Sequence, residues 1–156
     1  MMITEKSAGA IIWRKQKSQL EYLMIQSQPY KQFPSAWGFT KGHLEGTESN
    51  EDAAQREVYE EVGLNPKFDF TFHQVDTYHL TKNRQKEVTF FLAEFIEGQQ
   101  IKLQESEIRQ SAWLSYDEAQ KCLAAQNYKE FSYKELQLIL KKANSYLLNN
   151  ELRPKN

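Results

Sequence analysis

The sequence predicts an α/β sandwich in which a mixed β-sheet packs against helices. Short apolar or alternating runs typical of strands occur before, between and after two or more segments with helical periodicity, and their connections are mixed. The 156 residues are one domain in length and enough to bury a core. Residues 1–156 are therefore expected to form a single domain.

The first two strands are predicted over residues 7–14 and 21–28, which are short runs rich in apolar residues. The polar segment KQKSQ between them is typical of a hairpin turn. Residues 29–37 contain Pro29 and Pro34 and are predicted to form a loop. Because residues 37–40 lead into the most informative part of the chain, this loop is expected to lie near the functional site.

A helix is predicted over roughly residues 50–62, preceded by a loop in which Gly42 and Gly46 permit unusual backbone angles. Ser49 or Asn50 supplies a cap at its start, and Gly63 ends it. The helix should dock through a modest apolar stripe, with its glutamates facing elsewhere. This stripe comprises Ala53, Ala54, Val58 and Val62, with Tyr59 at its edge.

The rest of the chain predicts three strands and two helices. Strands are expected over residues 68–80 and 87–95, joined by the polar turn TKNRQ, and a weaker one over residues 108–114. Ser115, with Glu118 three residues on, begins a short helix to about Ala124. A last helix over residues 133–148 carries an apolar stripe, and residues 149–156 are expected to be a frayed tail.

Composition excludes several classes of protein. The 20 lysines and arginines nearly balance the 21 aspartates and glutamates, so there is no basic surplus for wrapping long nucleic acid. The chain contains no apolar stretch of membrane-spanning length, and its first residues lack a basic start followed by a long apolar run, so a soluble, unsecreted protein is expected. Its one cysteine, Cys122, is expected to be a core or half-buried thiol and not a nucleophile. We expect a cytoplasmic protein that is a monomer or a weak homodimer. Small nucleotides remain possible ligands.

The strongest functional signal is the stretch GHLEGTESNEDAAQREVYEEVGL over residues 42–64. It combines seven specified residues and two apolar ones at fixed spacings. At average residue usage this coincidence has a probability on the order of 10⁻¹⁰ per starting point. The specified residues are Gly42, Glu48, Arg56, Glu57, Glu60, Glu61 and Gly63, and the apolar ones are Val58 and Leu64.

Three acids of this stretch, Glu57, Glu60 and Glu61, are three and four residues apart and therefore converge on one face of a helix. Like charges at these spacings repel, so the cluster needs an offsetting partner. A divalent cation is the obvious one, and oxygen ligands favour magnesium, manganese or calcium over zinc. The alternative is that these acids form an ordinary solvent-exposed helix face. The other fixed positions of residues 42–64 argue against it.

These residues match the Nudix box of the Nudix hydrolases at every specified position. The family cleaves nucleoside diphosphates linked to another group with metal-activated water. The resemblance implies the Nudix fold, a mixed β-sheet sandwiched between α-helices (an α/β/α sandwich). It also implies Mg²⁺ or Mn²⁺ as the cofactor.

The resemblance implies roles for the residues of the box. Glu57 and Glu61 would coordinate metal, with Glu60 joining them when several ions bind and the Gly42 carbonyl as a further ligand. Glu48 and Arg56 would pair with each other and brace the loop against the helix. An acid outside the box completes the metal shell or acts as general base in many members. Glu107 is the candidate, six residues before Trp113, although Glu105 is close and either could be a surface glutamate.

The flanks of the box resemble the diadenosine tetraphosphate hydrolases. Residues 37–43, WGFTKGH, resemble their W-x-x-P-K-G-H segment, which implies that Lys41 and His43 contact phosphates. Lys86 resembles a further phosphate-contacting lysine, with a surface lysine as the alternative. Two residues depart from the pattern. Thr40 replaces the usual Pro, and Thr47 replaces a Gly that falls one place early, at Gly46.

A dinucleotide substrate needs aromatic surfaces on which its bases stack. Tyr128 and Phe131 are the preferred candidates, and Tyr78, Phe90 and Tyr133 are alternatives, although packing is the commoner role for any one of them. His73 and His79 lie in a strand run and are expected to be structural or solvated.

The resemblance implies a metal-dependent enzyme that hydrolyses diadenosine tetraphosphate asymmetrically to ATP and AMP. One alternative is a Nudix pyrophosphatase acting on nucleoside triphosphates or on the 5′ end of RNA. Another is an inactive Nudix domain that senses nucleotides, which the complete set of box acids disfavours.

Overall fold

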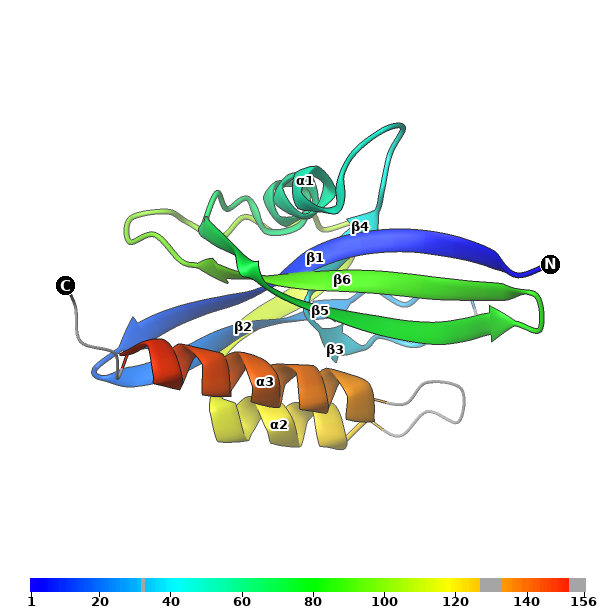
Figure 1. Ribbon diagram of the computed structural model, residues 1–156. Coiled ribbons are helices and arrows are strands. Elements are labelled where there is room, and N and C mark those ends of the chain that lie inside the picture. Colours follow the sequence, from blue (N-terminus) through cyan, green and yellow to red (C-terminus); the bar gives the residue numbers. More distant parts are fainter. Residues whose placement is uncertain (32, 127–132, 152–156) are drawn as a thin grey trace.

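The computed structural model describes residues 1–31, 33–126 and 133–151. In this part of the chain, seven strands form one mixed sheet in the order β3-β2-β1-β6-β5, with β4 paired to β1 and β7 paired to β2. Helix α1 covers one face, and α2 and α3 lie side by side on the other (Figure 1). The predicted α/β sandwich with a mixed sheet is confirmed.

Strands β1 (Ile3–Gln16) and β2 (Gln19–Ser27) form the predicted hairpin. Strand β1 extends beyond both predicted limits, whereas β2 begins two residues earlier and ends one residue earlier than predicted. The turn is two residues long, because Lys17 and Ser18 adopt positive φ values of 49° and 67°. Positive φ at both central residues matches the right-handed twist of the flanking strands. The polar segment therefore contributes strand ends as well as a turn.

Strand β1 is the centre of the sheet. It pairs in parallel with β6 (Arg84–Glu94) from Ile3 to Trp13 and antiparallel with β4 (Thr40–His43) from Ser7 to Ala10. Ile11 packs in the core under α2 and α3, whereas Ile12 packs in the core under α1. Since side chains alternate along a strand, odd-numbered residues of β1 face α2 and α3.

Residues 42–43, predicted to belong to a loop, are strand residues of β4. The prediction was wrong because it is pairing with β1, far away in sequence, that orders this segment. The two strands approach closely, and a Cβ atom on Gly9 would lie 1.8 Å from the carbonyl oxygen of Thr40. The Thr40 hydroxyl donates to the carbonyl of Ala10 at 3.1 Å.

Helix α1 (Asn50–Val62) has the predicted limits and caps. The Ser49 hydroxyl accepts from the Asp52 N–H, and Gly63, at φ 72°, donates to the Tyr59 carbonyl. The apolar stripe is buried as predicted, but two expectations fail. Tyr59 is 58% exposed, and Glu57 and Glu61 are buried with the stripe instead of facing away from it.

The remaining elements follow the predicted order. They are β3 (Trp37–Gly38), β5 (Lys67–Thr81), β7 (Ile108–Ser115), α2 (Tyr116–Ala124) and α3 (Lys134–Glu151). The β5–β6 turn is shorter than the predicted TKNRQ, because strand pairing extends to Thr81 and Arg84. Ser115 and Glu118 form the predicted capping box. Helix α3 includes residues 149–151, which were expected to be frayed, and the rest of that tail lies outside the described residues.

Among the helices of the described residues, none combines the length and the apolar character needed to cross a lipid bilayer.

Substituting Gly9 with alanine should separate β1 from β4. The new Cβ would meet backbone that cannot rotate away, so we expect the free energy of unfolding to fall by about 1 to 3 kcal/mol. Gly38→Ala is the matched control, because its nearest neighbouring atom would be 3.9 Å away. Chemical denaturation measures both variants, and equal effects would contradict the close approach.

Candidate active site

Two buried carboxylates of α1 pack against the backbone of β4. The Glu61 carboxylate accepts a hydrogen bond from the N–H of Lys41 at 2.8 Å. A Cβ atom on Gly42 would lie 2.0 Å from the carboxyl carbon of Glu57. Gly42 is therefore needed for close approach, not for the unusual backbone angle that was predicted. Gly46, at φ 54°, does adopt such an angle.

Burial opposes the ionisation of these two carboxylates when no counterion is bound. It raises the pKa of Glu61 from 4.5 to about 8, with a further contribution from the negative charge of Glu57. Burial also raises the pKa of Glu57, whereas the Arg56 guanidinium opposes that rise. Carboxylates that are costly to ionise alone would be stabilised as anions by a cation placed between them.

Arg56 is the hub of the acidic cluster. Its Nε and Nη2 donate to the two oxygens of Glu48 at 2.8 and 2.9 Å, the fork geometry of a strong arginine–carboxylate pair. This contact lowers the pKa of Glu48 to about 2. Arg56 Nη2 also donates to the carbonyl of His43 at 2.8 Å. The arginine thus ties helix α1 to both the loop and β4.

The same guanidinium also holds two of the expected metal ligands. Nη1 donates to Glu57 at 2.8 Å and to Glu60 at 3.1 Å, contacts that the predicted pairing with Glu48 did not include. With the side chains so engaged, no cluster of three His, Cys, Asp or Glu groups within the described ranges is arranged to hold a metal ion. The donor set itself, oxygens from adjacent carboxylates, suits a hard divalent cation.

Glu107 is brought to the box by a chain of backbone hydrogen bonds. Gln104 N–H donates to the Glu61 carbonyl, and Glu107 N–H donates to the Gln104 carbonyl, both at 2.9 Å. Gln28 N–H donates to the Glu107 carbonyl at 2.8 Å, so the loop after β2 begins beside this acid. The charge of Glu107 raises the pKa of both Glu57 and Glu61, which distinguishes it from Glu105.

The residues predicted to contact phosphates share the opposite face of the sheet. Lys41 pairs with Gly9, His43 with Ser7 and Lys86 with Glu5, all odd-numbered β1 positions that face α2 and α3. The Lys41 and Lys86 ammonium groups interact directly, and burial together with the charge of Lys41 lowers the pKa of Lys86 to about 8. Two cations held this close favour an anionic ligand between them.

The aromatic residues predicted to stack on bases differ in burial. Phe90 is buried edge-on against Phe39 at 5.7 Å between centroids, so it cannot stack on a base as suggested. Tyr78 is half-buried and pairs with Lys86. Burial raises its pKa to about 12. Tyr128 and Phe131 lie outside the described residues. His73 and His79 are exposed, in agreement with a solvated role.

Sequence reasoning missed Asp76, which shares the sheet face of the lysines. Asp76 lies two residues before Tyr78 on β5. Because residues two apart on a strand share a face, the sequence could have placed Asp76 on the same face as Tyr78. Its charge interacts with that of Lys41.

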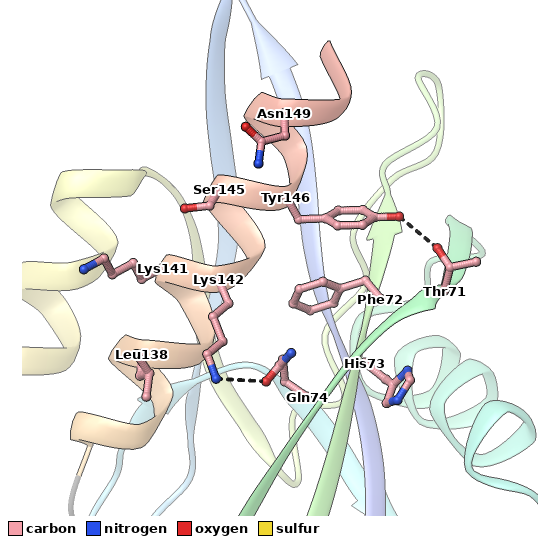
Figure 2. A pocket seen from close by; sticks show the side chains of 10 residues that line it. All are labelled: Thr71, Phe72, His73, Gln74, Leu138, Lys141, Lys142, Ser145, Tyr146 and Asn149. Carbon is pink, nitrogen blue, oxygen red and sulfur yellow. Dashed lines mark hydrogen bonds between the residues drawn. The ribbon is translucent and has the colours of Figure 1, made fainter. Parts of the chain in front are cut away.

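A separate open groove of about 710 Å³ lies between β5 and α3 (Figure 2). Phe72 and Tyr146 pack together within it, and Lys142 reaches across to Gln74 at 3.4 Å. None of the predicted site residues that the structure describes lines this groove. Its lining residues are Thr71, Phe72, His73, Gln74, Leu138, Lys141, Lys142, Ser145, Tyr146 and Asn149.

Comparison with known families agrees with this geometry. The model of the NUDIX domain matches residues 4–135, which is most of the chain. The chain belongs to the Nudix family. As a Nudix hydrolase it is a pyrophosphohydrolase, an enzyme acting on phosphoric anhydrides, and enzymes of this family generally use divalent metals.

Individual relatives extend the likeness over nearly the whole chain. The asymmetrical bis(5′-nucleosyl)-tetraphosphatase of Caenorhabditis elegans is 28% identical over 146 residues, 91% of this chain and 96% of that protein. A crystal structure of a C. elegans Ap4A hydrolase binary complex has a TM-score of 0.78 at 26% identity, covering 93% of this chain and 98% of the other.

A more distant neighbour shares the fold alone. The NUDIX domain of Shewanella oneidensis NrtR, crystallised with ADP-ribose, has a TM-score of 0.68 at 16% identity, covering 94% of this chain and 90% of the other.

Neutralising Glu61 should stabilise the metal-free Nudix domain at high pH. A carboxyl whose pKa rises from 4.5 to about 8 on folding binds its proton more tightly in the folded state. Its contribution to stability is therefore greatest below 4.5, falls as pH rises through this window and is constant above it. Glu61→Gln removes this dependence and keeps an acceptor for the Lys41 N–H.

Thermal unfolding of the metal-free protein at about pH 5 and about pH 9 measures the difference. We expect the variant to lose less stability than the wild type between these conditions. An equally steep or steeper loss would show that Glu61 is not desolvated in the folded state.

Proposed function

We propose that this Nudix hydrolase is metal-dependent and cleaves diadenosine tetraphosphate asymmetrically to ATP and AMP. The observation that carries the proposal is the arrangement around β4, where Glu57 and Glu61 lie on one side and Lys41, His43 and Lys86 lie on the other. The substrate is suggested by the likeness to the C. elegans asymmetrical tetraphosphatase, which extends over both chains.

The acidic side of β4 is the proposed metal site. Glu57 and Glu61 would hold the ion, with Glu60, the Gly42 carbonyl and Glu107 as further ligands. When bound, the ion neutralises phosphate charge and lowers the pKa of water that it binds. Arg56 holds Glu57 and Glu60 in place beside the loop through its fork to Glu48.

The basic side of β4 is the proposed polyphosphate site. Lys41, His43 and Lys86 would bind phosphate oxygens and orient the chain for attack by water. One water molecule adds across a bridging P–O bond, its oxygen going to phosphorus and its proton to Glu107 or solvent. The cleaved oxygen leaves as the terminal phosphate oxygen of the other nucleotide.

A substrate panel with magnesium tests the assignment. It compares product formation from diadenosine tetraphosphate, nucleoside triphosphates, dinucleotide sugars and triphosphorylated RNA. We expect ATP and AMP from diadenosine tetraphosphate at a rate well above that for the others. A higher rate on nucleoside triphosphates or RNA would contradict the proposed substrate, whereas the proposed reaction class would still hold.

Variants of the box acids test the reaction itself. Glu57→Gln and Glu61→Gln should lower kcat/KM by at least about 100-fold, the scale expected when positioned charge at the reacting centre is lost. Glu51→Gln, an exposed acid in the first turn of the same helix, is the charge-matched control and should remain active. Chelation with EDTA should abolish wild-type activity, and added magnesium or manganese should restore it.

A further inference from the structure

Asp76 is an unpaired carboxylate beside the proposed polyphosphate site. It is half-buried, and no residue in the described ranges forms a hydrogen bond or ion pair with its carboxylate. Burial raises its pKa, as does the charge of Glu135, whereas Lys41 opposes the rise. Carboxylates removed from water normally have donors, so Asp76 has an unused capacity to accept hydrogen bonds.

The strand register places Asp76 next to the lysine pair. Asp76 pairs with Val88 on β6, and two residues along, Tyr78 pairs with Lys86. Diagonal neighbours on one face of a sheet are about 7 to 8 Å apart, so Asp76 flanks Lys86 at that distance. The side chain of Lys41 approaches from the other edge, close enough for its charge to act on Asp76.

A second unsatisfied group lies in the same row of the sheet. Ser7 pairs with Val88 on one side and with His43 on the other, and it is 1% exposed. Its hydroxyl oxygen is buried and has no hydrogen-bond partner among the residues that the structure describes. A buried polar group without a partner destabilises the folded protein. The unsatisfied carboxylate of Asp76, beside two lysines and a histidine on the same sheet face, indicates a ligand that brings its own hydrogen-bond donors.

The chemistry of a carboxylate restricts what that ligand presents to Asp76. An ionised carboxylate only accepts hydrogen bonds, and its two oxygens suit a pair of adjacent donors. In a nucleotide, the donors nearest to a phosphate are the 2′ and 3′ hydroxyls of its ribose. Acidic side chains bind ribose hydroxyls in this way in dinucleotide-binding folds.

We propose that Asp76 accepts hydrogen bonds from the ribose hydroxyls of the nucleotide whose phosphate is bound by Lys41 and Lys86, and so makes the enzyme selective for ribonucleotides. This inference rests on the proposed function, because it takes the lysine pair as the polyphosphate site.

Binding of nucleotides to the full-length protein tests the proposal. Isothermal titration calorimetry with magnesium compares ATP with 2′-deoxy-ATP and 3′-deoxy-ATP on the wild-type protein. A hydrogen bond to a charged acceptor corresponds to about a 10- to 100-fold change in Kd, so each deoxynucleotide should bind more weakly by that factor. Equal affinity for ATP and both analogues would overturn the proposal without any variant.

Two variants identify Asp76 as the cause of the selectivity. Asp76→Ala should weaken ATP binding and leave the binding of the deoxynucleotides nearly unchanged, so that the difference between them disappears. Asp76→Asn keeps the size of the side chain and should retain a reduced difference. Glu135→Gln, at the exposed start of α3, removes the other acidic charge near Asp76 and should keep the wild-type selectivity.

Three results would count against Asp76 as the ribose-binding group. They are retained selectivity in Asp76→Ala, an equal loss of affinity for ATP and deoxynucleotides, and loss of selectivity in Glu135→Gln. Circular dichroism and thermal unfolding establish that each variant folds. Failure of the proposed function would be seen in the substrate panel, as the absence of ATP and AMP from diadenosine tetraphosphate. The binding comparison between ATP and its deoxy analogues would still decide whether Asp76 binds ribose.

Discussion

The packing of two carboxylates against the backbone of β4 is the constraint on which the rest of the site depends. Glu57 and Glu61 are 8% and 5% exposed, so their ionisation is opposed by the loss of water around them. Apolar burial of the same helix face and the fork of Arg56 offset that cost. Gly42 then has to lack a side chain, because Glu57 occupies the space of its Cβ.

Strand β4 connects two kinds of chemistry because side chains alternate across a sheet. Gly42 meets the carboxylates of α1, while its neighbours Lys41 and His43 share the opposite face with Lys86. The position of β4 in turn depends on Gly9 of β1, whose missing side chain permits the close approach to Thr40. A shift of β4 would therefore displace the acids and the cations together.

Long-range pairing gathers the groups outside the box. The parallel β1–β6 ladder pairs Lys86 with Glu5. The antiparallel β5–β6 ladder places Asp76 diagonally beside Lys86. Backbone hydrogen bonds from the end of α1 through Gln104 position Glu107. Within the part of the chain that the structure describes, Ser7 and Asp76 lack hydrogen-bond partners where these ladders meet, and the proposed ribose would supply the partners of Asp76.

The sequence by itself determined the limits of α1, its caps, the hairpin of β1 and β2, the mixed sheet and the reaction class. Each depends on local spacing, backbone preference or a pattern of acids within 23 residues. Only the tertiary structure decided that Glu57 and Glu61 are buried, that Tyr59 is exposed, that Phe90 is in the core and that Asp76 adjoins the lysines. These outcomes depend on which strands pair and in what register, and pairing between distant segments is set by burial of the whole core instead of by neighbours in the chain.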